Sequence, residues 1–213
     1  MPSKTAAAAN AQAPTLTRHE QRKSEIADIA AALFAANGYH ATSIQDLSDA
    51  TGLQRGALYH YIDSKKDLLY RIHERFIDPL LAQAREIDAR DVPADEAIRS
   101  LAHVLLETIH TYRDQVTVFL HEWKTITDDD SWATVRASRR EFENIFERVL
   151  RRGVKEGLFE ISDVRLATLG FVGMINYSHY WLNPEGRLRP DTIADRFVDY
   201  FLFGIASKNL RRR

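Results

Sequence analysis

Hydrophobic side chains recur along most of this 213-residue chain at intervals of three and four, the spacing of amphipathic α-helices. In Arg22–Asn37, for example, Ile26, Ile29 and Leu33 fall on one face, and Gly38 marks the end. No stretch of useful length alternates apolar and polar residues in the manner of a β-strand. The pattern therefore predicts an all-α protein.

Glycine, proline and capping residues divide the pattern into nine expected helices. Pro79 is expected to bend the fourth, and the loop Asn183–Pro190 separates the last two. The expected helices are Arg22–Asn37, the segment between Ser43 and Gly52, Gln54–Tyr61, Ser64–Ala89, Ala94–Tyr112, Arg113–Ile126, a long segment from Asp128 to Gly157, Val164–Leu182 and Thr192–Ser207.

The segment Thr42–Tyr61 predicts two short helices joined by a tight turn. Ser43 can cap the first helix, with Asp46 three residues further on. Gly52 can adopt the left-handed conformation that ends that helix, and Leu53 can then fill the joint. This arrangement is typical of a helix-turn-helix that reads DNA.

The second helix of this motif carries side chains suited to a DNA groove. Gln and Arg can form paired hydrogen bonds with base edges, and Gly56 allows close approach. Lys65 and Lys66 oppose the dipole at a helix start, and a DNA phosphate would relieve that misfit. We expect groove contacts from Gln54, Arg55, Ala57, Tyr59 and His60, and phosphate contacts from Thr42, Tyr61 and Lys65. Ser43 and Gly56 complete the expected DNA-binding set.

Charge adds a restriction to this interpretation. Residues 18–66 hold six basic and six acidic side chains, which cancel, and the whole chain carries a formal charge of −1. A broad basic surface that coats nucleic acid without specificity is therefore excluded. Binding must depend on a few positioned cations.

Four motifs in Leu33–Leu69 together resemble the DNA-binding domain of the tetracycline-repressor family of bacterial transcriptional regulators. They are F-x-x-x-G-Y, T-S/T-I-x-D-L, G-x-L-Y-H-Y and S-K-x-x-L-L. The resemblance implies a homodimer that binds a near-palindromic operator and is released by a small ligand. The expected domains are a DNA-binding domain at 17–66 and a ligand-binding and dimerisation domain at 67–208, flanked by a basic tail at 209–213 and by a disordered arm at 1–16, whose residues are small and polar.

The segment Glu156–Leu188 extends the resemblance to one branch of that family. Its E-G-L/Y-F and W-x-x-P-x-G motifs are similar to the C-terminal domain of regulators of lipid or steroid catabolism. Such regulators respond to acyl-CoA thioesters. The resemblance therefore implies an apolar effector of the acyl-CoA type.

The last two expected helices are apolar around more than one face, so they must be covered on more than one face. They can be deep core helices or a subunit interface, and the family resemblance favours the interface. Candidate interface residues are Phe171, Ile175, Trp181, Phe197, Tyr200 and Phe201.

A ligand cavity needs apolar walls and a few polar anchors. The middle helices offer both, although aromatic residues at helical spacing also occur in an ordinary core. Candidate walls are Phe119, Trp123, Phe142, Phe146, Met174 and Tyr177, and candidate anchors are His121, Asn176 and His179.

An enzyme or metal-binding helical bundle is the main alternative. His103, Glu107 and His110 lie on one helix face, and the last two have the E-x-x-H spacing of di-iron bundles. A second such motif is absent from the sequence, as are phosphate loops and nucleophile elbows. We expect no catalytic residue, metal or cofactor. A helical adaptor remains a third class, and DNA binding would distinguish it from a regulator.

Composition restricts the cellular location that we expect for the protein. The chain has no cysteine, which excludes disulfides and cysteine–metal sites. It has no apolar run of about 18 residues, so a membrane span is not expected. The first 16 residues are small and polar and do not resemble a secretory signal. We therefore expect a cytoplasmic protein.

Overall fold

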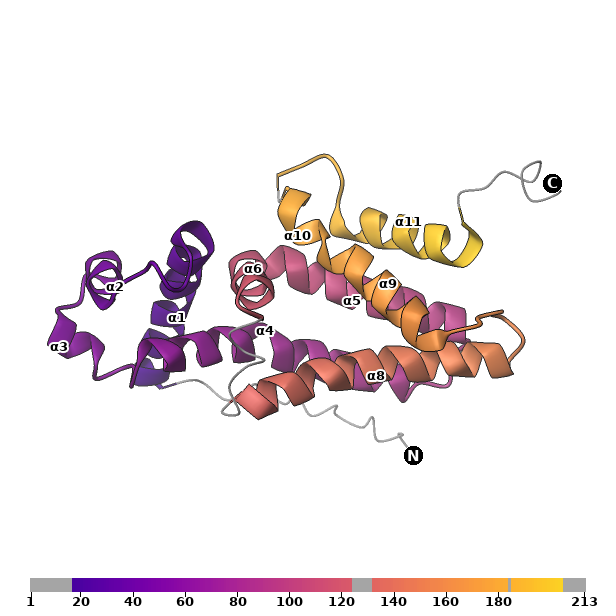
Figure 1. Cartoon of the computed structure of the whole chain (residues 1–213), viewed down its shortest axis with the longest axis horizontal. Coiled ribbons are helices and arrows are strands. Elements are labelled where there is room, and N and C mark those ends of the chain that lie inside the picture. The colour runs from indigo at the N-terminus through magenta and orange to yellow at the C-terminus, as the bar shows by residue number, and fades with distance from the viewer. Residues whose placement is uncertain (1–16, 124–131, 184, 205–213) are drawn as a thin grey trace, which may run out of the picture.

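The structure is a computed structural model that describes residues 17–123, 132–183 and 185–204 (Figure 1). These ranges hold ten helices and no strand, which confirms the all-α class. The helices are α1 (Arg18–Asn37), α2 (Ile44–Thr51), α3 (Arg55–Leu58), α4 (Lys65–Asp88), α5 (Ala94–Thr111), α6 (Arg113–His121), α8 (Ala133–Lys155), α9 (Val164–Asn176), α10 (Ser178–Trp181) and α11 (Pro190–Phe203). The expected arm at 1–16 and the basic tail at 209–213 lie outside the described residues.

The N-terminal unit consists of α1, α2 and α3, at one end of the long molecule (Figure 1). The expected cap of α2 is confirmed, because Ser43 accepts from the Asp46 N–H while the Asp46 carboxylate accepts from the Ser43 N–H. Gly52 has φ +67°, the left-handed value that ends α2. Leu47 and Leu58 are fully buried between the helices. Local sequence signals thus build this unit as expected.

Two helix boundaries in this unit differ from expectation. Helix α1 starts at Arg18 rather than Arg22, because Thr17 and Glu20 form a reciprocal capping box. Helix α3 ends at Leu58 rather than Tyr61. There the N–H groups of His60 and Tyr61 donate to the carbonyls of Ala57 and Leu58, so three-residue turns replace the α-helical ladder.

Helix α4 connects the N-terminal unit to the remaining helices (Figure 1). It contains Pro79, as expected, and packs against α1, α5, α6 and α8. Near its middle, Arg75 pairs with Asp28 of α1 at 2.9 Å. Near its end, Arg85 pairs with Glu141 of α8 at 2.7 Å. One continuous helix therefore contacts both parts of the molecule.

The expected helix Val164–Leu182 is divided at Tyr177 into α9 and α10. The His179 ring Nδ1 lies 2.7 Å from the carbonyl oxygen of Asn176, and the Tyr180 N–H donates to Tyr177 instead. A side chain thus occupies the carbonyl that would continue the ladder. The other expected helices appear as single segments within the described ranges, and their described ends differ from expectation by a few residues. The expected boundaries at Ile126 and Asp128 lie outside the described residues.

Helix α11 packs along α5 through charged side chains as well as apolar ones. Arg99 of α5 donates to Asp195 at 3.0 Å and to Asp199 at 2.8 Å. None of the described helices is long and apolar enough to cross a lipid bilayer.

Candidate nucleic-acid interface and effector pocket

The expected DNA-reading side chains gather on the outer surface around α3. Gln54, Arg55, Gly56 and His60 are exposed there, and Tyr59 is 49% exposed. Gln54 precedes the helix without using its side chain as a cap, so its amide is available for another partner. Ala57 is half-buried. Helix α3 lies at the tip of the molecule, where a DNA duplex can approach it (Figure 1).

Thr42 does not fit its expected role as a phosphate contact. Its side chain is buried, with 2% exposed, and its hydroxyl donates to the carbonyl of Gly38 at 2.9 Å. The residue therefore closes the loop between α1 and α2. Ser43 beside it is exposed and caps α2.

Lys65, which we expected to contact a DNA phosphate, has partners within the chain. Its ammonium donates to the carbonyls of Tyr39 at 2.8 Å and Thr42 at 2.9 Å. It also lies 4.4 Å from the centre of the Tyr39 ring. These carbonyls offset the unfavourable position of the Lys65 charge at the start of α4. Lys65 thereby ties α4 to the loop before the reading motif.

Sequence reasoning missed a basic groove beside Tyr61. The Tyr61 ring stacks on His19 at 5.0 Å, which brings the start of α1 next to the end of the reading motif. No local pattern predicts this contact, because about forty residues separate the two rings. Side chains that line the groove are Arg18, His19, Gln21, Arg22, Glu25 and Tyr61.

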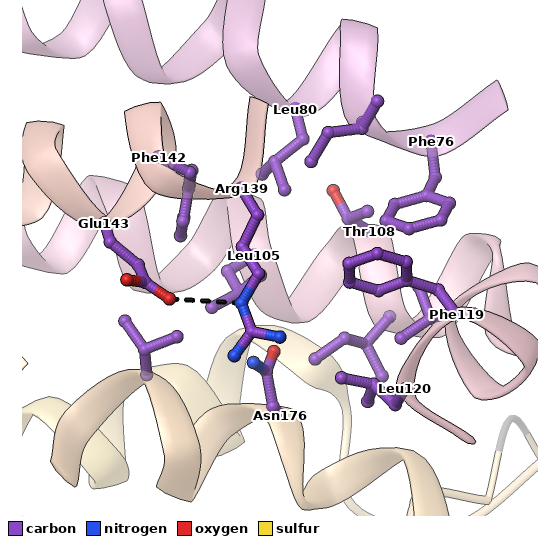
Figure 2. A pocket seen from close by; sticks show the side chains of 14 residues that line it. Phe76, Leu80, Leu105, Thr108, Phe119, Leu120, Arg139, Phe142, Glu143 and Asn176 are labelled. Atoms are coloured by element: carbon purple, nitrogen blue, oxygen red, sulfur yellow. Dashed lines mark hydrogen bonds and ion pairs between the residues drawn. The ribbon is translucent and has the colours of Figure 1, made fainter. Parts of the chain in front are cut away.

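A second site is an apolar cavity of about 50 Å³ enclosed by α4, α5, α6, α8 and α9 (Figure 2). Most of its walls are aliphatic or aromatic, and the polar groups are Thr108, Arg139, Glu143 and Asn176. The lining residues are Phe76, Ile77, Leu80, Leu105, Thr108, Ile109, Val116, Phe119, Leu120, Arg139, Phe142, Glu143, Val172 and Asn176.

Three of the nine expected pocket residues line this cavity: Phe119, Phe142 and Asn176. Phe146 does not, because it is fully buried between the rings of Phe142 and Phe171. Tyr177 is 63% exposed and points to the surface. Three others also lie outside the lining: His121 and His179 contact Tyr180, and Met174 packs on the core.

Trp123 and Arg139 form a layer next to the cavity. The guanidinium of Arg139 lies 4.0 Å from the Trp123 ring centre, and Trp123 in turn contacts Phe119 edge-on. Trp123 therefore supports a wall without lining it.

The charged pair Arg139 and Glu143 escaped the sequence reasoning. Glu143 is only 7% exposed and accepts from Arg139 Nε at 3.1 Å and from Arg165 at 2.8 Å. Arg165 also donates to Glu147 at 2.8 Å, and the hydrogen bonds to Glu147 and Glu143 raise its pKa. An ion pair at i and i+4 on the face that carries Phe142 could have signalled a polar feature in the core.

His73 lies behind the aromatic wall of the cavity. It is 2% exposed, packs against the rings of Phe76 and Phe119, and its Nε2 has no partner among the described residues. Burial lowers the pKa of this imidazole to about 4, so the ring is neutral at neutral pH.

Helices α9, α10 and α11 expose a large apolar surface, although not through all of the expected residues. Phe171 and Ile175 are core residues with at most 1% exposed, and Phe201 stacks on Phe171 at 4.3 Å. Phe197 is half-buried against Trp181. We define the α9–α11 face by its exposed side chains: Leu166, Leu169, Tyr177, Tyr180, Trp181, Tyr200 and Phe203.

Two of the three residues of the alternative catalytic or metal face, His103 and Glu107, have other partners. His103 lies between Asp191 at 3.2 Å and Asp195 at 2.9 Å, so both of its ring nitrogens contact α11. Glu107 is exposed and accepts from Thr111. Within the described ranges no three histidine or carboxylate side chains come together as a metal site.

Comparisons with known proteins agree with this arrangement. Residues 26–72 match the family model for bacterial regulatory proteins of the tetR family, and residues 91–205 match a tetracyclin repressor-like C-terminal domain. The KstR2 transcriptional repressor of Rhodococcus jostii is 32% identical over 187 residues, which cover 87% of this chain and 92% of that protein.

Two solved structures show the same architecture. The ketosteroid transcriptional regulator KstR2 of Mycobacterium tuberculosis has a TM-score of 0.81 at 26% identity, covering 88% of this chain and 96% of that one. AibR, solved with isovaleryl coenzyme A and operator DNA, has a TM-score of 0.76 at 26% identity, covering 85% and 98%. The chain therefore belongs to the TetR family, whose members are transcriptional regulators rather than enzymes.

Proposed function

We propose that this protein is a homodimeric repressor that binds an operator through α3 and leaves it when an acyl-CoA occupies the cavity. The observation that carries the proposal is the path between the two sites. Phe76, Ile77 and Leu80 of α4 line the cavity, while Lys65 at the start of the same helix holds the loop before the reading motif. As a DNA-binding regulator the protein would act in the cytoplasm.

Homodimer formation is supported by the α9–α11 face. Its large apolar side chains are between 44% and 67% exposed in a single chain, and a partner subunit would cover them. A two-fold arrangement would pair this surface with itself and place two α3 helices on one side. Two readers separated by about one DNA turn, roughly 34 Å, would then bind a palindromic site.

An acyl-CoA effector is supported by the apolar walls of the cavity and by the ligand of AibR. Such a ligand can release DNA only if it binds the released conformation more tightly than the DNA-bound one. Movement of α4 around a filled cavity would change the separation of the two readers. That change would lower operator affinity.

The first test is a gel shift with DNA fragments from the region next to the gene, because regulators of this kind often control adjacent genes. We expect a discrete protein–DNA complex that dissociates when an acyl-CoA is added. Binding of random fragments with equal affinity would contradict sequence-specific regulation. A stable complex unchanged by every small molecule tested would leave DNA binding intact but contradict the switch.

The assignment of base contacts is tested at Arg55. Replacing Arg55 with Ala should weaken operator binding by about 1–3 kcal/mol if its guanidinium reads a base. Arg90→Ala is the matched control, since Arg90 is also exposed but follows the far end of α4. Unchanged operator affinity in folded Arg55→Ala would show that α3 reads DNA through other side chains.

A further inference from the structure

Arg139 is the cation among the residues that line the cavity. We propose that Arg139 and Asn176 hold the carbonyl oxygen of an acyl thioester, so that the pocket selects thioesters over free acids. This inference rests on the proposed function, because it names the chemistry by which the effector is recognised. Four features of the described residues support it: hydrogen-bonding capacity, orientation, charge balance and shape.

The guanidinium is fixed but not saturated. Its Nε donates to Glu143, and its Cζ lies over the Trp123 ring, 4.0 Å from the ring centre. Neither of its terminal amino groups has an acceptor among the described residues. Two contacts therefore define the plane of the guanidinium while leaving donors for a ligand.

The donors point toward the polar end of the cavity. Figure 2 shows the guanidinium directed toward the Asn176 side chain, which comes from the last residue of α9. The Asn176 amide can donate to the same oxygen, so two donors from different helices converge. Asn176 was an expected anchor, whereas its partner on α8 becomes evident only in three dimensions.

Charge balance favours a neutral oxygen. The carboxylate of Glu143 already neutralises Arg139, because it accepts from Arg139 Nε at 3.1 Å, and it also accepts from Arg165 at 2.8 Å. A bound carboxylate would add a negative charge beside Glu143, which is largely buried. A thioester carbonyl accepts the same hydrogen bonds without adding charge.

The volume of the cavity fits a short acyl group and is too small for the nucleotide of coenzyme A. A volume of about 50 Å³ holds roughly three to five water-sized groups, at about 10–15 Å³ each. Leu80, Leu105 and Phe119 surround that space with apolar atoms. A short acyl chain therefore fits as the cavity stands, and the nucleotide of coenzyme A must remain outside.

The test measures equilibrium binding of butyryl-CoA, butyrate and free CoA to the full-length protein by calorimetry. The wild-type protein should bind butyryl-CoA more tightly than butyrate or CoA. Arg139→Gln should weaken butyryl-CoA binding about 10- to 100-fold and Asn176→Leu about 3- to 10-fold, the cost of a charged and a neutral hydrogen bond. Binding of free CoA should change in neither variant.

Arg140→Gln is the matched control, because Arg140 is the exposed neighbour on the same helix. Asn176→Leu leaves the Glu143 ion pairs intact, so it separates loss of the anchor from a loosened core. Equal butyryl-CoA affinity in all variants would show that Arg139 and Asn176 do not hold the carbonyl oxygen. The proposal that the effector is an acyl-CoA would still stand. Butyrate binding as tightly as butyryl-CoA would overturn the charge argument. No binding of butyryl-CoA to the wild-type protein would overturn this inference and the acyl-CoA part of the proposed function, while operator binding is measured separately.

Discussion

Individual buried polar contacts shape both sites of this regulator. The Lys65 ammonium bonds to the carbonyls of Tyr39 and Thr42, and the His73 Nε2 has no partner among the described residues. The first contact strengthens the DNA-binding unit, whereas the second leaves a group whose protonation the fold opposes. Each has a measurable consequence for stability.

Lys65→Met should lower the free energy of unfolding by about 1–2 kcal/mol, because it removes two hydrogen bonds from a charged, partly exposed group. Urea unfolding followed by circular dichroism measures this. Lys155→Met, in the exposed last turn of α8, should change stability by less than about 0.5 kcal/mol. A Lys65 variant as stable as the wild type that loses only salt-dependent operator binding would favour the phosphate role instead.

His73 should make stability depend on pH. Its folded-state pKa of about 4 lies below the ordinary value of 6.5, so the unfolded chain binds the proton first as pH falls. The stabilisation is complete above pH 6.5 and decreases toward pH 4, with about 2 kcal/mol lost at pH 5. His73→Leu should remove this part of the difference between unfolding at pH 7.5 and pH 5. Exposed His60→Asn is the control, and a pH dependence that survives in His73→Leu would rule out this residue as its source.

At the scale of helices, amphipathic faces decide what packs against what. Phe171 and Ile175 point into the core from α9, and Leu166 and Leu169 of the same helix point outward. The outward residues join those of α10 and α11 into one apolar face. One face of α9 therefore packs in the core of its own chain. By our proposal, the opposite face packs against a second subunit.

Tyr200→Glu should convert the dimer into monomers, because it places a charge in the proposed contact of the α9–α11 face. Sedimentation at micromolar concentration measures the change, and operator affinity should decrease with it since a monomer contacts only a half-site. Val154→Glu, on the exposed side of α8, should leave the assembly unchanged. If the Tyr200→Glu variant remained dimeric and bound the operator normally, the dimer interface would not be the α9–α11 face.

Across the whole molecule, α4 is the element that both sites share. It contributes Phe76, Ile77 and Leu80 to the cavity, and ion pairs tie it to α1 and α8. Because it is one continuous helix, a shift at the cavity must be transmitted along its length or absorbed at Pro79. The switch that we propose requires the shift to be transmitted along α4 to the DNA-binding unit.

Thermodynamic linkage gives this switch a strict test. If an acyl-CoA lowers operator affinity by a given factor, saturating operator DNA must lower acyl-CoA affinity by the same factor. Calorimetric titration of the acyl-CoA into free protein and into the operator complex measures both. If the acyl-CoA released DNA while its own affinity stayed the same in the operator complex, the release would not come from binding of the acyl-CoA to this protein's cavity.

Local signals in the sequence were sufficient for the helix-turn-helix. The Ser43 cap, the left-handed Gly52 and the buried Leu58 all act within a few residues, so their consequences follow from the sequence alone. The all-α class follows for the same reason, since helical periodicity is itself local.

Which face of each helix meets which neighbour was decided only by the tertiary structure. Arg139 and Asn176 lie 37 positions apart, and Lys65 reaches carbonyls more than twenty residues before it. The i,i+4 spacing of Arg139 and Glu143 on α8 could have signalled a polar feature in the core, but its position beside Asn176 depends on how the helices pack. The sequence therefore determined the helices and the DNA-reading motif, whereas packing between distant segments decided the cavity, its polar end and the exposed apolar face, because those depend on contacts that no local pattern encodes.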